Sequence, residues 1–438
     1  MTATFAGYAS IFIFTVAYLM IALEDKIQIN KSKPALLAGT LIYIIIAMHY
    51  AIYGKDIEGL HHNVEHLIVE IASIYFFLFV AMTYIETLIE RNVFEALKYR
   101  LLLRGYDYKK LFWATGVLAF FLSPVADNLT TALILSTVLL TLEHHNRQFL
   151  VLGAINIVVA ANAGGAWSPF GDITTLMVWT AGKGTFAEFL FLFPASIIGW
   201  LLSAYLLSRY IPEGYPGDDN SGACKTPELV KMKKGGKVIM ALGIFTIVMA
   251  VSSHQLLHLP AFWGMLFGLA LLKFYSTVLK KRNDEHIWIY KRMASVENDT
   301  LLFFFGLLAA VGGLSYIGYI ALIAGVYDII DPFWVNSMVG VVSAIIDNVP
   351  LMFAVLKANP VMDGTQWMLV TLTAGIGGSL ISFGSAAGVG VMGRLRGIYT
   401  FQSHMKYAWI VALGYMVSIA VYYVQFELLG LHVSKVGS

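Results

Sequence analysis

The sequence contains few charged residues and almost no cysteine. Charged residues make up 13% of its 438 positions, whereas soluble proteins carry about 25%. The single cysteine, Cys224, excludes an intrachain disulfide framework and a metal site built from several cysteines. Hydrophobic residues make up 58% of the chain. This composition predicts an all-α membrane protein that crosses the bilayer many times.

The basic residues form short clusters beside apolar segments, which is a pattern of membrane topology and not of nucleic-acid binding. The N-terminal segment lacks the basic region of a signal peptide, so we expect it to be a retained span. A spanning helix needs about 20 apolar residues. On that criterion we expect plain spans at 5–23, 34–53, 67–89, 186–207, 238–252, 260–279, 300–324 and 407–424.

Four further apolar segments are each interrupted in the middle by polar residues. Segments 111–141 and 332–356 carry the tips SPVADN and SAIIDN, and we expect each segment to form a re-entrant hairpin. Segments 149–181 and 366–393 carry NAGGAWSPFGD and GGSLISFGS, and we expect each to be a spanning helix that unwinds midway. With the plain spans, this makes about ten transmembrane helices, two hairpins and two broken helices.

The two halves of the sequence repeat this order in opposite orientations. The first repeat covers 1–211 and the second 238–438, with a cytoplasmic loop at 212–237, and residues 164–172 align with 377–385 without a gap. Lysine and arginine counts place both termini outside, so the first hairpin enters from the cytoplasm and the second from outside. Inverted repeats with broken helices near the midplane are typical of secondary transporters.

The residues at the four interruptions are oxygen donors. Carbonyl, hydroxyl and carboxylate oxygens suit a hard cation such as Na⁺. None of the four segments contains lysine or arginine, which favours a bare cation over an organic anion. The candidate ligands are Ser123, Asp127, Asn128, Thr130, Thr131, Asn162, Ser168, Asp172, Thr174, Thr175, Ser343, Asp347, Asn348, Ser379, Ser382 and Ser385.

Three of these candidates, Asp127, Asp172 and Asp347, are carboxylates inside apolar segments. A carboxylate within the membrane is costly unless it binds a cation or a proton. Burial disfavours its charged form, so Na⁺ and H⁺ would compete for the same oxygens, and that competition is sufficient for exchange. An alternative role for each is to cap the helix that follows it.

The four motifs in combination resemble those of NhaD-type sodium/proton antiporters, within the ion transporter superfamily. The resemblance implies exchange of cytoplasmic Na⁺ or Li⁺ for external H⁺ in the bacterial inner membrane, by a homodimer that moves as an elevator. It implies neither a cofactor nor an enzymatic reaction. The matching functional positions are Ser123, Asp127, Asn128, Thr130, Asp172, Thr174, Ser343, Asp347, Asn348, Ser382 and Ser385, with Na⁺ at the three aspartates and two asparagines. Further acidic positions that match are Glu70, Glu297 and Asp299.

The amphipathic stretch 90–110, apolar on one side and basic on the other, is typical of a helix at the membrane surface. We expect this stretch and its counterpart near 320–331 to join a fixed scaffold to a moving, ion-carrying unit. All four interrupted segments lie beyond one or the other of these stretches in the sequence.

Other functions remain as alternatives. A sodium-coupled dicarboxylate or arsenite-type transporter of the same superfamily would carry Ser-Asn-Thr tips, where both tips here carry Asp-Asn. An intramembrane hydrolase is disfavoured because the histidines fall at the membrane faces. A passive channel is disfavoured because hairpins from opposite sides suit alternating access. His62 and His66, like His254 and His258, have the spacing of a metal pair or pH sensor, although interfacial histidines are usually neither.

Overall fold

Every regular element that the computed structural model describes is a helix, which confirms the predicted all-α class. The structure describes residues 1–27, 29–54, 57–102, 104–216, 231–283, 287–431 and 433. Cys224 and most of the predicted 212–237 loop lie outside the described residues.

Eight of the described helices are long and apolar enough to cross a membrane. They are Ser32–Ile52, Ile57–Glu90, Arg147–Ala166, Phe186–Ser208, Gly236–Gln255, Phe262–Lys281, Asn298–Ile317 and Ala408–Leu428. The protein is therefore an integral membrane protein, as the composition predicts.

The chain folds into two compact units, and each unit draws on both halves of the sequence. Unit 1 contains Met1–Arg91, Lys234–Ile329 and Phe353–Val361. Unit 2 contains Asn92–Lys233, Ile330–Met352 and Met362–Ser438. Two of the boundaries fall inside the stretches predicted to link a scaffold to an ion-carrying unit. The predicted division into repeats at 212–237 is a different division of the chain, and it stays a prediction.

Unit 1 is a helical bundle in which two helices approach closely through glycines. A Cβ atom added to Gly39 would lie 2.5 Å from the carbonyl oxygen of Gly306, so small residues let α3 and α15 pack backbone to backbone. The helices of unit 1 are α1 (Phe5–Ala22), α2 (Glu24–Ile27), α3 (Ser32–Ile52), α4 (Ile57–Glu90), α12 (Gly236–Gln255), α13 (Phe262–Asn283), α14 (Ile289–Ser295), α15 (Asn298–Ile317) and α16 (Ala321–Ile329).

Two boundaries in unit 1 differ from the predicted ones. Helix α4 begins at Ile57 and not at 67, so the polar stretch with His62 and His66 belongs to the helix. At about 1.5 Å per residue, its 34 residues exceed the bilayer core of about 30 Å. The predicted span 300–324 is two helices, because Gly318 ends α15 in the left-handed conformation with φ 107°.

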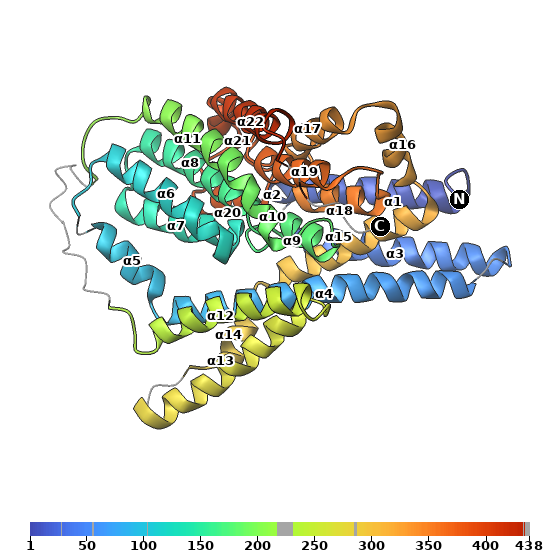
Figure 1. Ribbon diagram of the computed structural model, residues 1–438, viewed down its shortest axis with the longest axis horizontal. Coiled ribbons are helices and arrows are strands. Elements are labelled where there is room, and N and C mark those ends of the chain that lie inside the picture. Colours follow the sequence, from blue (N-terminus) through green and yellow to red (C-terminus); the bar gives the residue numbers. More distant parts are fainter. Residues whose placement is uncertain are drawn as a thin grey trace. The chain divides into compact units, whose positions relative to one another are not determined.

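Unit 2 is built around α8 (Arg147–Ala166), which packs against α6, α7, α11 and α19 (Figure 1). Its residues from Phe149 to Ala166 are all buried. The other helices of unit 2 are α5 (Val93–Leu102), α6 (Tyr108–Ala126), α7 (Asn128–Leu142), α9 (Ile173–Thr180), α10 (Phe186–Phe189), η1 (Leu190–Leu192), α11 (Phe193–Ser208), α17 (Pro332–Ser343), α19 (Gly364–Gly377), α20 (Ala386–Arg394), α21 (Phe401–Met405), α22 (Ala408–Tyr423) and η2 (Val424–Leu428). Helix α18 (Asn348–Ala358) begins in unit 2 and ends in unit 1.

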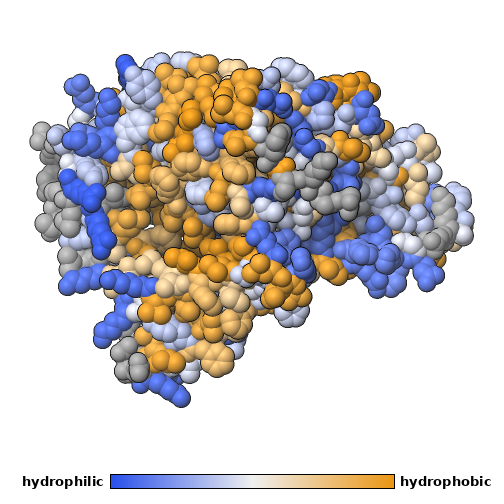
Figure 2. All heavy atoms as spheres, in the orientation of Figure 1, coloured by the Kyte–Doolittle hydropathy of each residue, from blue (hydrophilic) through white to orange (hydrophobic). Residues whose placement is uncertain are grey.

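The outer face of unit 2 is hydrophobic where α11 and α22 pack against each other (Figure 2). Among the exposed side chains of these two helices are those of Leu201, Tyr205, Trp409 and Met416. An apolar surface of this kind is suited to lipid, whereas most of the predicted ligands at the four interruptions are buried.

Candidate ion-binding site

Within the tip of the first hairpin segment, only Asp127 lies outside the helices α6 and α7. The two helices lie side by side and contact each other (Figure 1). Asp127 has φ 57°, and its carboxylate accepts hydrogen bonds from the Thr130 N–H at 2.7 Å and the Thr130 hydroxyl at 2.8 Å. Asp127 therefore caps α7, which is the alternative role considered for it; capping does not consume all the lone pairs of a carboxylate.

The first broken segment unwinds between Ala166, the end of α8, and Ile173, the start of α9. Asp172 is the N-cap of α9 and forms a capping box with Thr175. Its side chain is buried, with 4% of the residue exposed. Asp172 therefore also caps the helix that follows it: the Thr174 N–H donates to Asp172 Oδ1 at 3.1 Å.

The second oxygen of Asp172 receives a hydrogen bond from each hairpin tip. Asn128 donates to Oδ2 at 2.7 Å and Asn348 donates to the same atom at 3.0 Å. All three side chains are buried. The Asp347 carboxylate, next to Asn348, interacts electrostatically with that of Asp172. The structure therefore brings Asn128, Asn348 and Asp347 to one buried carboxylate within unit 2, whereas the hydrogen bonds of Asp127 go to Thr130.

Asn162 links this carboxylate to the second broken segment. Its Oδ1 accepts from Asn128 at 3.0 Å, and its Nδ2 donates to Ser379 at 2.8 Å and to Ser385 at 2.9 Å. Asn162 and Ser379 are among the oxygen donors predicted from the sequence. Neither is among the functional positions that match the NhaD-type antiporters. The feature of the sequence that indicates Asn162 is a polar amide side chain within the otherwise apolar residues of α8.

The serines that precede the two tips attach them to the broken helices. The Ser123 hydroxyl donates to the Ala161 carbonyl at 2.6 Å, and the Ser343 hydroxyl donates to the Ala374 carbonyl at 2.8 Å. Both serines are predicted ligands. Each hydroxyl donates its proton to a helix backbone and so attaches its tip to a broken helix, while its predicted role as a ligand stays a prediction.

Three buried hydroxyls at the interruptions have no hydrogen-bond partner among the described residues. They belong to Ser382 in the second break, Thr131 in the first turn of α7 and Thr174 in the first turn of α9. Buried polar atoms are nearly always paired, and an unpaired one calls for an explanation such as an ion or water. Ser382 is a predicted ligand, and its unsatisfied oxygen is consistent with that role.

The two breaks share the same glycine contact. A Cβ atom on Gly165 would lie 2.5 Å from the Gly171 carbonyl oxygen, and one on Gly378 would lie 2.8 Å from the Gly384 carbonyl oxygen. These pairs occupy matching positions in the gapless alignment. Each break thus folds back on itself so tightly that only glycine fits.

The second hairpin segment differs from the prediction at one end. Helix α17 ends at Ser343 and α18 begins at Asn348, with Asp347 accepting from the Val349 N–H at 3.3 Å. Helix α18 continues to Ala358 and so includes Lys357. The four predicted segments contain no basic residue, but the helices extend beyond them: α18 includes Lys357, and basic residues also lie at the outer ends of α6, α8 and α20.

The three further acidic candidates lie in unit 1 with partners of their own. Glu70 forms an ion pair with Lys357. Asp299 accepts from Asn30 at 2.9 Å and from Ser32 at 3.2 Å. Glu297 accepts from the Thr300 hydroxyl at 3.0 Å. None of these contacts reaches the Asp172 cluster, so their predicted role stays a prediction.

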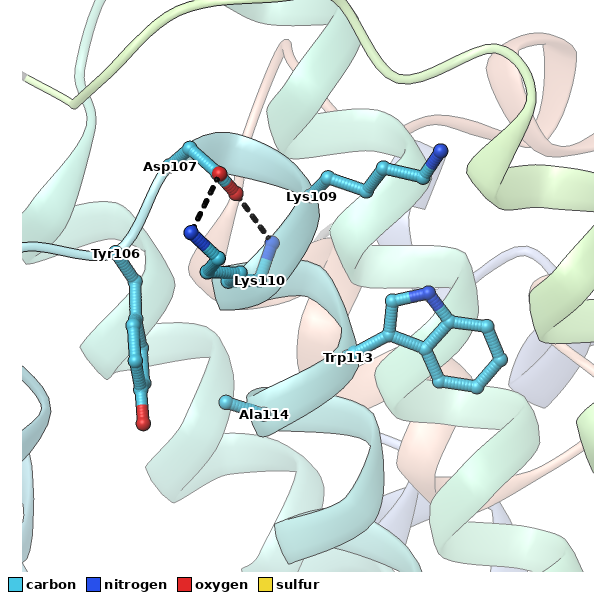
Figure 3. A pocket seen from close by; sticks show the side chains of 6 residues that line it. All are labelled: Tyr106, Asp107, Lys109, Lys110, Trp113 and Ala114. Carbon is cyan, nitrogen blue, oxygen red and sulfur yellow. Dashed lines mark hydrogen bonds and ion pairs between the residues drawn. The ribbon is translucent and has the colours of Figure 1, made fainter.

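A cavity of about 570 Å³ lies at the start of α6, and Figure 3 shows the side chains that line it. Asp107 caps the helix there and forms an ion pair with Lys110 at 3.2 Å, while the side chain of Lys109 points away from Asp107. The cavity is lined by Tyr106, Asp107, Lys109, Lys110, Trp113 and Ala114. It shares no residue with the Asp172 cluster and is separate from the candidate site.

The comparisons with known proteins agree with the motifs. A family model described as a citrate transporter (CitMHS) matches residues 11–375. The chain is 44% identical to a Na(+)/H(+) antiporter NhaD of Vibrio cholerae, over 95% of this chain and 91% of that protein. This chain belongs to the NhaD antiporter family. A second NhaD, from Alkalimonas amylolytica, is 42% identical over 96% of this chain and 91% of its own length.

More distant relatives of the NhaD family have similar names. Sodium/proton antiporter 1 of Arabidopsis thaliana is 30% identical, over 94% of this chain and 71% of that protein. The predicted resemblance to NhaD-type antiporters is therefore confirmed, and these relatives are named as antiporters and not as enzymes.

Proposed function

We propose that this protein exchanges cytoplasmic Na⁺ or Li⁺ for external H⁺ across the cytoplasmic membrane of a bacterium. The observation that supports the proposal is that the buried carboxylate of Asp172 is surrounded by neutral hydrogen-bond donors. Its buried carboxylate receives hydrogen bonds from Asn128, Asn348 and a backbone N–H, all of which are neutral donors. No cationic side chain among the described residues is bonded to it.

A buried carboxylate without a protein cation is neutralised by a proton or by a bound metal ion. A second carboxylate, that of Asp347, is close enough to interact electrostatically with it. Two nearby carboxylates raise the cost of leaving the site empty of cations, because like charges repel at short range in a medium of low dielectric constant. Na⁺ binding and protonation are then alternatives at the same oxygens, and this competition couples the two fluxes.

We further propose that the two hairpin segments are re-entrant and that the two repeats are inverted in the membrane. Unit 2, which holds the Asp172 cluster, would carry the ion past unit 1 in an elevator motion, within a homodimer. Supporting this division, the boundaries at Arg91 and Ile329 fall in the predicted connecting stretches. Breaks in spanning helices are tolerated only where protein or water surrounds them, as the buried breaks of unit 2 are.

The experiment is proton-gradient dissipation in everted vesicles that contain the protein. Addition of NaCl or LiCl should dissipate the gradient, while KCl serves as the cation comparison. The matched variant is Asp172→Asn, which keeps the size of the side chain and loses its exchangeable charge. Equal sodium-dependent dissipation by wild type and Asp172→Asn would contradict the proposed role of this carboxylate.

A sodium-coupled carboxylate transporter is the second candidate, and the citrate-transporter description of the family model favours it. The contacts of the Asp172 cluster argue against it, because an organic anion would ordinarily be bound by lysine or arginine. Uptake of labelled citrate and succinate with and without Na⁺ decides between the two. Sodium-dependent accumulation of either anion, without proton exchange, would establish the second function in place of the first.

A further inference from the structure

A short helix outside the spanning segments contacts the second break through two side chains. In α21, the His404 Nε2 atom lies 3.2 Å from the Leu380 carbonyl oxygen. The ring of Phe401, one turn earlier, stacks on that of Phe383 with centroids 5.5 Å apart. Leu380 and Phe383 both belong to the irregular stretch between α19 and α20. The second break is thus held from α21 at two points.

The hydrogen bonds of His404 define its chemical state. The side chain is fully buried, and so is that of Tyr399, whose hydroxyl lies 2.7 Å from Nδ1. A carbonyl oxygen can only accept, so Nε2 carries the hydrogen and donates it to Leu380. Nδ1 is then the acceptor for the Tyr399 hydroxyl. Burial lowers the pKa of His404 to about 4, so this neutral form persists at physiological pH.

The Leu380 carbonyl needs such a donor because of where it lies. It follows the C-terminal end of α19, where carbonyls lose their intrahelical partners. A backbone carbonyl left without a partner away from water is costly. The residue just before it, Ser379, accepts the hydrogen bond from Asn162. One peptide unit therefore separates the His404 contact from the Asp172 network.

We propose that His404 is a positioning residue for ion binding, because its Nε2–H bond to Leu380 fixes the second break in the shape that presents Ser379 and Ser385 to Asn162. The proposal rests on the proposed function of the Asp172 cluster in ion exchange. His404 itself touches no ion. Its effect passes through the backbone of the break, with Tyr399 holding the imidazole in the donating tautomer.

The test compares two substitutions of His404 with a control. His404→Gln places an amide N–H near the position of Nε2 and keeps the bond, whereas His404→Leu removes it. The control, His144→Leu, replaces an exposed histidine in the loop after α7. The sodium concentration that gives half-maximal proton exchange is measured in everted vesicles. We expect it to rise about tenfold for His404→Leu and to stay within about threefold of wild type for His404→Gln and the control.

Tyr399→Phe gives a second test that does not depend on His404→Leu folding. This change removes the hydroxyl that donates to His404 Nδ1, so the imidazole is no longer held in the tautomer with its hydrogen on Nε2. We expect about a threefold rise in the half-saturating sodium concentration. Sodium binding to the purified variants, measured as the shift of Tm with NaCl, should weaken in the same order.

The outcomes separate the two proposals. If wild type fails to exchange ions, the proposed function is wrong. If wild type exchanges ions while Tyr399→Phe keeps the wild-type half-saturating concentration, the positioning role is wrong. It is also wrong if His404→Leu or Tyr399→Phe lowers only the maximal rate, because the half-saturating sodium concentration is then unchanged. If His404→Leu is folded and has a raised half-saturating sodium concentration, the same rise in His404→Gln would likewise overturn the positioning role.

Discussion

Asn162 and Ser379 lie 217 positions apart in the sequence, yet the Asn162 Nδ2 atom is 2.8 Å from the Ser379 hydroxyl oxygen. The same nitrogen donates to Ser385, and Oδ1 of the same amide accepts from Asn128. One side chain from the first half of the chain is therefore bonded to the second break and to the first tip. A change in the shape of either element must alter the hydrogen bonds of the other.

We expect Asn162→Ala to raise the half-saturating sodium concentration about tenfold, because Asn128, Ser379 and Ser385 each lose a partner. Each buried polar group left unpaired costs about 1–3 kcal/mol, so Tm should fall as well. Sodium-dependent exchange in vesicles and the Tm of the purified protein check both effects. The control is Thr137→Ala, whose hydroxyl donates to the Leu133 carbonyl of its own helix. Normal sodium dependence in Asn162→Ala would contradict this prediction.

The sequence predicted the interruptions of the helices well, because polar residues within apolar segments have few structural explanations. The tips at Asp127 and Asp347 and the breaks before Asp172 and Ser385 all coincide with helix ends. Capping explains why: a carboxylate or hydroxyl that follows an unwound stretch accepts the first free N–H groups of the next helix.

The rest depended on tertiary contacts that local patterns do not encode. The sequence listed Asn162 as an oxygen donor but could not show that its amide joins the two halves. The ion pair of Glu70 with Lys357 was missed because α18 runs past the predicted end of its segment. The long α4 was missed because its first turns are polar, and an amphipathic turn beyond the bilayer resembles a loop in composition.

The tip carboxylates provide the next prediction. Asp127→Asn should leave the stability of the fold nearly unchanged, because asparagine caps a helix about as well as aspartate does. Asp347→Asn should behave similarly. Both changes should abolish exchange, since an amide can neither hold a proton for transfer nor provide a negative charge for Na⁺. Exchange rates in vesicles, normalised to the amount of folded protein, check this. Near wild-type rates in both variants would place the coupled proton elsewhere.

Accessibility of the tips tests the inverted repeats. Val125 and Ile345 occupy matching positions, and both side chains are exposed in the structure, at 54% and 63%. In a background with Cys224→Ser, we expect Val125→Cys and Ile345→Cys to react with a membrane-impermeant thiol reagent from opposite sides of the membrane. Sodium should change the rate of labelling if the tips close around the ion. Labelling of both positions from one side only, at every sodium concentration, is incompatible with inverted hairpins.

His404 gives a prediction about stability and pH. Its pKa in the folded protein is about 4, below the ordinary value of 6.5, because burial disfavours the charged imidazolium. At pH 7.5 both folded and unfolded states are largely neutral at this residue. As the pH falls through 6.5, His404 binds a proton in the unfolded state but stays neutral in the folded state. The free energy of unfolding should therefore decrease, by about 2 kcal/mol at pH 5.

The His404→Gln variant isolates this contribution, because glutamine does not titrate and keeps a donor for the Leu380 carbonyl. Tyr399, the other titratable group bonded to His404, stays protonated over this range, since burial raises its pKa. The Tm of wild type should thus fall more steeply between pH 7.5 and pH 5 than that of His404→Gln, while His144→Leu should follow wild type. Parallel curves for wild type and His404→Gln would show that His404 is already charged or accessible to water in the folded protein. In that case its hydrogen bond to Leu380 could not depend on a neutral, buried imidazole.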